Sequence, residues 1–340
     1  MTPLLTVSNL HVVFKNRNKP IHAVRGVSFS LKKQEMLALV GESGSGKSVT
    51  ARAITRLLSK DRTEIWADEM ILDDQDLQAM SDKQYQNIRG NKIAMILQDP
   101  ISSLNPTQKV GIQISECVKK QDRTLNKYEV KQRVLQLLSM VKMPSPEIHY
   151  SQYPFELSGG MCQRISIAMA FAFKPQIIIA DEPTTALDVT TQAEILSLMK
   201  ELQVKTKTSI ILITHDLGIV FKYCDRALVM YGGEIIESGA VTHLFKSPNH
   251  PYTSLLLSSL PQLNQISKKL AQIEGSPIHL SQRVSGCSFF ERCPHAMNIC
   301  NQRAPPAIRH ENGSLSTCWL GFKNSQNKKV EVEVEEVVKC

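Results

Sequence analysis

The eight residues from Gly41 to Ser48 constrain this chain more than any other stretch. They read Gly-Glu-Ser-Gly-Ser-Gly-Lys-Ser and fit the pattern G-x-x-x-x-G-K-[ST]. An apolar run, Met36 to Val40, precedes them, and a segment compatible with a helix, Val49 to Leu58, follows. A strand, a glycine-rich loop and a helix in this order predict a loop whose backbone N–H groups surround a polyphosphate.

Individual residues of this loop have distinct expected roles. The glycines allow backbone conformations that a Cβ would resist, so successive amide groups can converge on one ligand. Lys47 is expected to place its charge on the β- and γ-phosphates of a nucleotide, and Ser48 to hold Mg²⁺. The predicted nucleotide-binding residues of this segment are Gly41, Ser43, Gly44, Ser45, Gly46, Lys47, Ser48 and Val49.

The composition is that of a soluble globular protein with two domains, or with one large domain and an appendage. The chain has 340 residues, of which 42% are hydrophobic and 21% charged. We find no apolar run near the roughly 18 to 20 residues that span a bilayer, and Met1 to Leu10 does not resemble a secretory signal. A cytoplasmic protein is therefore expected. The net charge of +8 suits anionic partners, but no basic run with interleaved aromatics predicts nucleic-acid binding.

Short apolar segments that alternate with helical ones predict an α/β fold with a mostly parallel sheet. Ala227 to Tyr231 and Glu234 to Glu237, separated by Gly232-Gly233, predict a hairpin. The other predicted strands are Leu4 to Phe14, Ala23 to Leu31, Met36 to Val40, a pair within Glu64 to Leu72, Ile93 to Leu97, Ile177 to Ala180 and Ile210 to Ile213.

The region from Asp99 to about Phe155 is predicted to be a helical insertion. Helical periodicity is clear from Tyr128 to Val141, and prolines interrupt the rest. Helices are also predicted at Ser81 to Arg89, Gln163 to Phe173 and Thr191 to Gln203. Beyond about Phe245 the periodic pattern ends, and proline, histidine and cysteine become frequent, which predicts a separate small unit.

Two carboxylates follow the apolar strand Ile177 to Ala180. Burial of the strand is expected to fix Asp181 at the carboxyl edge of the sheet, where open α/β sheets bind ligands. We assign Asp181 to the magnesium ion, through water, and Glu182 to the general base that polarises the attacking water.

A second glycine motif, Leu157-Ser158-Gly159-Gly160-Met161, precedes the helix Gln163 to Phe173. A serine and two glycines at a helix N-terminus can form an anion site from a hydroxyl, free N–H groups and the helix dipole. The other interpretation is an ordinary helix cap, and from these residues alone we favour the cap.

The order of these motifs resembles that of the ATP-binding cassette (ABC) ATPases over roughly residues 4 to 245. The order is the phosphate loop, Gln98, Ser158-Gly159-Gly160, Asp181-Glu182, Ala186-Leu187-Asp188 and His215. The resemblance implies an α/β core with antiparallel N-terminal strands and a helical subdomain at about 99 to 170. It also implies that two cassettes face each other head to tail, each completing the ATP site of the other.

The resemblance also implies roles for single residues. Phe14 would stack on adenine, and Gln98 would sense Mg²⁺ and the attacking water while linking to membrane subunits. Asp188 would reach across the dimer, and His215 would contact the γ-phosphate as a charge-assisted donor. Two positions depart from the family pattern: Cys162 replaces a usual arginine, and Gln34 replaces a common turn glycine. We expect both to alter local packing rather than activity.

Three segments narrow the resemblance to the ATPases of oligopeptide and dipeptide importers. Two of them are Gln98 to Pro106 and Asn249 to Leu256, which includes His250-Pro251-Tyr252. The third is the pattern C-x5-C-x6-C-x17-C. Its spacing leaves a tetrahedral zinc, a [4Fe–4S] cluster or free thiols open, whereas the resemblance favours the iron–sulfur cluster. The predicted ligands are Cys287, Cys293, Cys300 and Cys318.

The resemblance covers about residues 1 to 322. It divides the chain into an ATP-binding domain (1–245), an extension with the cysteines (246–322) and a flexible tail (323–340). It implies ATP and Mg²⁺ as ligands and an ATPase that powers peptide import. The expected partners are a second cassette subunit, forming a heterodimer, two transmembrane permeases and an extracytoplasmic binding protein. The expected location is the cytoplasmic face of the bacterial plasma membrane.

Several other functions fit the same layout. Nickel or metallophore importers, antimicrobial-peptide uptake systems and glutathione importers share it, and the ATPase sequence carries little information about the cargo. A cassette ATPase of DNA repair or of ribosomes usually carries tandem cassettes or a long coiled-coil insertion, and this sequence has neither. A third possibility is a redox- or iron-sensing regulator in which the cysteine unit is the functional part. Because the hydrolytic residues are intact, sensing would be a secondary role at most.

Overall fold

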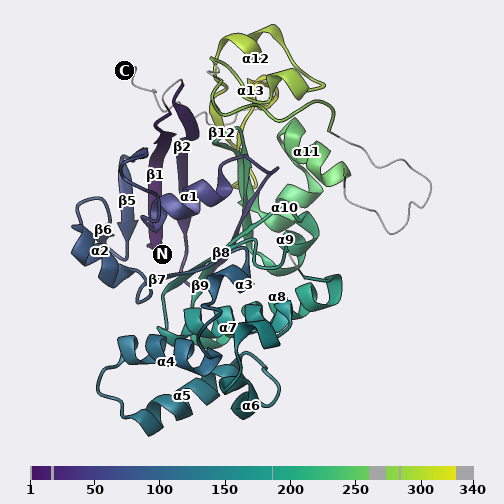
Figure 1. The fold of residues 1–340 in the computed structure, drawn as a ribbon. Helices are drawn as coiled ribbons and strands as arrows, with labels where there is room; N and C mark the ends of the chain where they lie inside the picture. Colours follow the sequence, from purple (N-terminus) through teal and green to yellow (C-terminus); the bar gives the residue numbers. More distant parts are fainter. Residues whose placement is uncertain (1, 17–18, 186, 260–272, 283–284, 327–340) are drawn as a thin grey trace. The chain divides into compact units, whose positions relative to one another are not determined.

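The computed structural model describes residues 2–16, 19–185, 187–259, 273–282 and 285–326 (Figure 1). Ala186 and the predicted tail beyond residue 326 lie outside the described residues. The chain divides into two compact units. We call residues 1–4, 31–36 and 75–213 the helix-rich unit, and residues 5–30, 37–74 and 214–340 the phosphate-loop unit. No helix in the described ranges is long and apolar enough to cross a membrane.

The N-terminal strands of the phosphate-loop unit are antiparallel, as predicted. Strand β1 (Leu5–Phe14) pairs with β4 (Thr63–Trp66) and β5 (Glu69–Leu72), and β2 (Ile21–Leu31) is also its neighbour. The buried positions of β1 change from odd to even numbers at Asn9, which has a φ of 50°. This local irregularity keeps the apolar residues on both sides of Asn9 in the core.

The phosphate loop follows a fully buried strand. Strand β3 (Met36–Val40) pairs in parallel with β10 (Arg226–Tyr231), which forms a hairpin with β11 (Glu234–Ala240). The predicted hairpin is confirmed, and its two glycines have φ values of 57° and 89°, as a tight two-residue turn requires. Helix α1 (Lys47–Ile54) begins two residues earlier than the prediction and ends before Leu58.

The C-terminal extension continues the sheet of this unit. Strand β13 (Leu315–Thr317) pairs with β11 and with β12 (Ala307–Arg309), both antiparallel. The helices of the phosphate-loop unit that follow residue 214 are α9 (Leu217–Tyr223), α10 (Val241–Lys246), α11 (Pro251–Ser258), the 3₁₀ turn η2 (Phe290–Arg292), α12 (Asn298–Gln302) and α13 (Trp319–Gln326).

The helix-rich unit contains three parallel strands, which confirms the predicted α/β class. Strand β8 (Ile177–Asp181) lies between β7 (Ile93–Ile96) and β9 (Ser209–Thr214). Every residue of β8 and β9 is buried, as expected for strands covered on both faces. Helix α8 (Val189–Thr206) provides the crossover from β8 to β9, and α7 (Gly159–Ala172) precedes β8.

The predicted helical insertion is present, and its helices gather at one end of this unit (Figure 1). Helix α5 (Lys127–Met140) shows why it folds: Asn126 and Glu129 form a reciprocal capping box. Its buried residues recur at the spacing of one helical face. The remaining elements are β6 (Gln75–Asp76), α2 (Asp82–Ile88), α3 (Pro100–Ser103), α4 (Val110–Gln121), α6 (Pro146–Tyr150) and the 3₁₀ turn η1 (Pro154–Glu156).

The two departures from the family pattern have local structural consequences. Gln34 has a φ of 60°, a left-handed conformation that costs a residue with a Cβ about 1–2 kcal/mol. Its backbone N–H donates to Oγ of Ser209 at 2.9 Å, which helps to hold the turn. Cys162 is fully buried in α7, and its thiol donates to the carbonyl of Pro154 at 3.6 Å.

Candidate functional site

The backbone of the phosphate loop has the conformation that its glycines allow. Gly41, Gly44 and Gly46 have φ values of 152°, 79° and 104°. A Cβ on Gly41 would lie 2.1 Å from the carbonyl oxygen of Met230, and one on Gly46 would lie 2.6 Å from that of Ala23. Both glycines are therefore required by close backbone approach as well as by φ.

The lysine of the loop is turned into the loop. Nζ of Lys47 donates to the carbonyl oxygens of Gly41 and Glu42, each at 2.8 Å, and the residue is 5% exposed. Gly46 is the N-cap of α1, so within the described residues no side chain caps the first turn. The amide groups at a helix start attract anions. Ser43 and Gly44 are exposed, Ser45 is buried, and Ser48 and Val49 are half-buried.

Two further predicted site residues belong to the phosphate-loop unit. Phe14 is half-buried at the last position of β1, opposite Thr63. His215 is exposed and directly follows β9. The next residue, Asp216, caps α9 by accepting from the amides of Gly218 and Ile219. The turn that carries His215 is therefore fixed by the start of a helix.

The structure brings two predicted catalytic residues of the helix-rich unit together. Nε2 of Gln98 donates to Oε2 of Glu182 at 3.1 Å. Glu182 has a φ of 47°, and its N–H donates to the carbonyl of Ile213 at 3.0 Å. Asp181, the last residue of β8, is only 1% exposed. The backbone thus turns sharply after β8, which leaves the carboxylate of Asp181 buried and that of Glu182 half-buried.

Thr185 is a site residue that the sequence interpretation missed. Its hydroxyl donates to Oε2 of Glu182 at 2.9 Å, the same oxygen that Gln98 contacts. A threonine three residues after a carboxylate in a turn is a local pattern that can indicate a hydrogen bond between the two side chains.

The second glycine motif and the aspartate both cap helices. The hydroxyl of Ser158 accepts from the amide of Met161 at 3.3 Å, at the start of α7. The carboxylate of Asp188 accepts from the amide of Thr191 at 3.0 Å, at the start of α8. The hydrogen bond from the amide of Thr191 lowers the pKa of the Asp188 carboxyl group. A Cβ on Gly160 would lie 2.6 Å from the methyl group of Thr191, so this glycine allows the two helix starts to approach.

The four predicted cysteine ligands lie around one small cavity. Cys287, Cys293, Cys300 and Cys318 line it, and its volume is ≈ 10 Å³, about the room of one water molecule. The amide of Cys287 donates to the carbonyl of Cys300 at 2.7 Å. Burial raises the pKa of the Cys287 thiol to about 12 and also raises the pKa values of Cys293 and Cys318.

The prediction of an iron–sulfur cluster at these cysteines is wrong. Across the described residues, no group of three or more His, Cys, Asp or Glu side chains is arranged to hold a metal ion. The physical reason is space, because a cavity of ≈ 10 Å³ has no room for a four-iron cube. The same finding on the described residues gives no support to a zinc ion at these cysteines.

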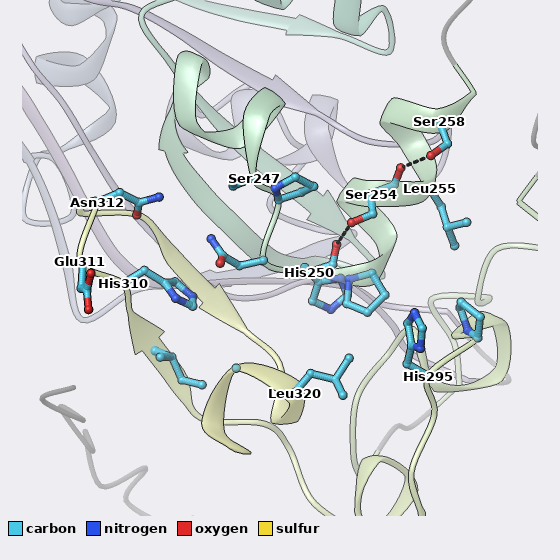
Figure 2. A pocket seen from close by; sticks show the side chains of 16 residues that line it. Ser247, His250, Ser254, Leu255, Ser258, His295, His310, Glu311, Asn312 and Leu320 are labelled. Atoms are coloured by element: carbon cyan, nitrogen blue, oxygen red, sulfur yellow. Dashed lines mark hydrogen bonds between the residues drawn. The ribbon is translucent and has the colours of Figure 1, made fainter. Parts of the chain in front are cut away.

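A larger cavity lies in the extension, between α11, the β12–β13 strands and the segment with His295 (Figure 2). Its volume is ≈ 780 Å³, and its wall includes His250, Leu255, His310 and Leu320. Hydrogen bonds from Ser254 to the carbonyl of His250, and from Ser258 to that of Ser254, run along α11 beside it. Residues of the phosphate loop are not part of its wall, so this cavity is separate from the loop.

Two residues of the extension contact the phosphate loop, and the sequence interpretation gave neither a role. The hydroxyl of Tyr252 accepts from the amide of Glu42 at 2.9 Å. Arg292 forms an ion pair with the carboxylate of Glu42. Tyr252 belongs to the quoted His-Pro-Tyr segment, which was a signal for importance but not for this contact. Arg292 carried no sequence signal.

Two family models match the chain. The model described as "ABC transporter" matches residues 24–185. The model described as "Oligopeptide/dipeptide transporter, C-terminal region" matches residues 236–300. The first includes the phosphate loop and Glu182, and the second includes Tyr252 and Arg292.

Curated relatives match over nearly the whole chain. The oligopeptide transport ATP-binding protein OppD of Bacillus subtilis is 46% identical, covering 100% of this chain and 94% of the relative. The dipeptide transport ATP-binding protein DppD of B. subtilis is also 46% identical, covering 96% and 97%. DppD of Escherichia coli is 42% identical, covering 93% and 96%.

Solved structures agree with these matches. The cassette MJ0796, in a dimeric post-hydrolysis state with ADP and Pi, has a TM-score of 0.61 at 27% identity, covering 70% of this chain and 98% of that one. CbiO1 of Clostridium perfringens has a TM-score of 0.62 at 27% identity, covering 73% and 92%. One of these structures is described as an ATP-binding cassette and the other as part of an ABC transporter complex. The chain therefore belongs to the ABC transporter ATP-binding proteins, in the oligopeptide/dipeptide transporter group.

Proposed function

We propose that this chain is the ATP-hydrolysing subunit of an ABC importer that brings peptides across the bacterial plasma membrane. The observation that carries the proposal is the 46% identity to an oligopeptide transport ATP-binding protein over 100% of the chain. The phosphate loop supports it, because its glycines have the required φ values and its lysine is held at the loop. These features fit a nucleoside triphosphate with its magnesium ion.

The phosphate-loop residues would hold ATP. The backbone amides from Ser43 to Val49 would surround the phosphates, and Lys47 would exchange its two carbonyl partners for phosphate oxygens. Phe14 would contact adenine, and His215 the γ-phosphate. Ser48, Gln98 and Asp181 would hold Mg²⁺, which when bound neutralises charge that develops on the phosphate oxygens.

Glu182 would act as the general base. Its carboxylate would accept a proton from the attacking water, while Gln98 and Thr185 fix one of its oxygens by the hydrogen bonds of 3.1 and 2.9 Å. The second oxygen would then face the water. A base held in one orientation contributes more to the rate than a rotating one, because the reacting atoms start closer to the required geometry.

The active assembly would contain a second cassette subunit, different from this one. Ser158, Gly159, Gly160 and Asp188 of this chain would complete the partner's nucleotide site, with the α7 helix start facing its phosphates. The dimeric state of the similar cassette MJ0796 supports this arrangement. Two permeases and an extracytoplasmic binding protein would form the rest of the importer, with this chain on the cytoplasmic face.

We further propose that residues 1–245 form the ATP-binding domain, with a helical subdomain at about 99–170, and that 246–322 form the extension, followed by a tail at 323–340. The separate family matches at residues 24–185 and 236–300 support this division.

Uptake measurements test the proposed cargo. Cells that lack this gene should lose uptake of a labelled oligopeptide and regain it with the wild-type chain but not with Lys47→Ala. Normal peptide uptake in the deleted cells, together with lost uptake of nickel or glutathione, would contradict the peptide assignment. Loss of none of these cargoes would contradict the importer assignment as a whole.

A further inference from the structure

Glu42, the second residue of the phosphate loop, makes contacts through three of its own groups: the amide, the carbonyl and the carboxylate. Its amide N–H donates to the hydroxyl of Tyr252 at 2.9 Å. Its carbonyl oxygen accepts from Nζ of Lys47 at 2.8 Å. Its carboxylate accepts from the guanidinium of Arg292, at 2.6 Å from Nη1 and 3.0 Å from Nη2. Two of these three contacts come from the C-terminal extension.

The contact with Arg292 is a bidentate ion pair in a mostly buried place. The side chain of Arg292 is 5% exposed and that of Glu42 is 24% exposed. The guanidinium carbon lies 5.7 Å from the ring centre of Tyr231 and 6.0 Å from that of Phe289. The fork of an arginine matches a carboxylate, and aromatic faces favour its charge. Arg292 therefore has one well-defined orientation, in which its guanidinium group faces Glu42 of the phosphate loop.

The contact with Tyr252 is built by the segment around His250. The carboxylate of Glu237 on β11 accepts from the amides of Asn249 and His250, at 2.6 and 3.1 Å. Nδ1 of His250 then accepts from the amide of Tyr252 at 3.0 Å, and Pro251 occupies the first turn of α11. These caps fix where the helix begins.

The ring of Tyr252 is fully buried and packs against two other aromatic rings. Its ring centre lies 4.8 Å from that of Tyr231 and 5.2 Å from that of Phe289. The hydroxyl therefore reaches the loop from a rigid support. Burial raises the pKa of Tyr252, so the hydroxyl stays neutral and can accept from the amide of Glu42.

We propose that Tyr252 and Arg292 are positioning residues for nucleotide binding, which act through Glu42 to hold the phosphate loop in the conformation that accepts a triphosphate. The physical reason lies in the two peptide groups that flank Glu42. Their orientations decide where the carbonyl oxygens of Gly41 and Glu42 point, and thus where these oxygens hold Nζ of Lys47. This inference rests on the proposed nucleotide site and assigns a new role to the extension.

The test compares variants in the intact complex, purified through a tag on this chain. Tyr252→Phe removes only the acceptor for the Glu42 amide, and Arg292→Met removes the ion pair while keeping much of the side-chain volume. We expect each to raise the KM for ATP by about three- to tenfold, since Tyr252→Phe removes one hydrogen bond to Glu42 and Arg292→Met removes two, with kcat changed less than about twofold. Arg292→Lys should recover part of the loss, because the charge remains while the fork is lost.

A double-mutant cycle isolates the contact. Glu42→Gln combined with Arg292→Met should raise KM no more than the larger single change, since both remove the same ion pair. Arg303→Met, at an exposed arginine of the extension, is the matched control and should keep the wild-type KM. A purely structural role would instead lower kcat in proportion to the folded fraction and leave KM unchanged.

Lys47→Ala separates failure of this inference from failure of the proposed nucleotide site. If Lys47→Ala weakens ATP binding by about 100-fold while Tyr252→Phe and Arg292→Lys keep the wild-type KM, the positioning role is overturned and the nucleotide site stands. If Lys47→Ala binds ATP with wild-type affinity, the nucleotide site itself is overturned. These conservative variants keep the test decisive even if Arg292→Met fails to fold.

Discussion

Gln98 and Glu182 lie 84 residues apart in the sequence and are joined by a hydrogen bond of 3.1 Å from Nε2 to Oε2. The hydroxyl of Thr185 donates to the same oxygen at 2.9 Å. Two donors on one carboxylate oxygen restrict rotation of the carboxylate. The proposed base is thus oriented by two neighbouring side chains.

The orientation can be tested by removing one donor at a time. Thr185→Val should lower kcat for ATP hydrolysis by up to about tenfold, because one hydrogen bond contributes about 0.5–1.5 kcal/mol. Gln98→Ala should lower it further, because Gln98 is also a proposed magnesium ligand. Phosphate release under saturating ATP is the measurement. Wild-type kcat in both variants would show that the orientation of Glu182 does not matter for turnover.

Lys47→Ala should weaken ATP binding by about 100-fold, because the lysine would form charge-assisted hydrogen bonds of about 1.5–3 kcal/mol each with the phosphates. Equilibrium titration with ATP and Mg²⁺ measures the dissociation constant. Lys119→Ala, at an exposed lysine of α4, should bind as the wild type does. Equal affinities for all three proteins would contradict the assigned role of Lys47.

The buried His250 should make stability depend on pH. Burial lowers the pKa of His250 from 6.5 to about 3. The unfolded chain therefore takes up a proton below about pH 6.5, whereas the folded chain does not, so the free energy of unfolding falls as the pH falls. This residue alone should cost about 2 kcal/mol between pH 7 and pH 5.

Urea unfolding at the two pH values measures this effect. His250→Asn, which keeps a capping side chain, should lose about that part of the pH dependence. His243→Asn, at an exposed position of α10, should keep it. The same pH dependence in His250→Asn and the wild type would show that His250 is protonated in the folded chain.

The turn at Gln34 should be stabilised by glycine. Its φ of 60° is unfavourable for a residue with a Cβ, so Gln34→Gly should raise the free energy of unfolding by about 1 kcal/mol. Gln34→Ala keeps a Cβ and should leave stability nearly unchanged. Denaturant unfolding of the three proteins decides the matter, and a stability gain in the alanine variant would argue against backbone strain.

The sequence predicts features that depend on near neighbours. The strand Met36 to Val40 and the hairpin at Gly232-Gly233 were predicted because burial and turn chemistry act over a few residues. Helix α1 begins two residues before its predicted start, since residues of the phosphate loop do not look helical by composition. The helix after Asn126 is predicted from its periodicity, and the capping box at Asn126 is the structural reason for its start.

Contacts between distant residues set the limit of sequence interpretation. Glu42 and Tyr252 are 210 residues apart, and no local pattern links them. The cysteine spacing also gives no information on the space between the side chains, and there the prediction of a metal cluster is wrong. The order of the motifs identifies the candidate ATP site. Only the fold shows that the C-terminal extension contacts the phosphate loop, through Tyr252 and Arg292.

The most direct test of the account is turnover by Glu182→Gln in the intact complex. The glutamine keeps the size of the side chain and an oxygen for Gln98 and Thr185, but it cannot take a proton from water. We expect wild-type ATP affinity and a fall in hydrolysis of at least about 100-fold, the usual contribution of a general base. Hydrolysis at the wild-type rate, measured as phosphate released per ATP bound, would contradict the assignment of this site as the catalytic centre.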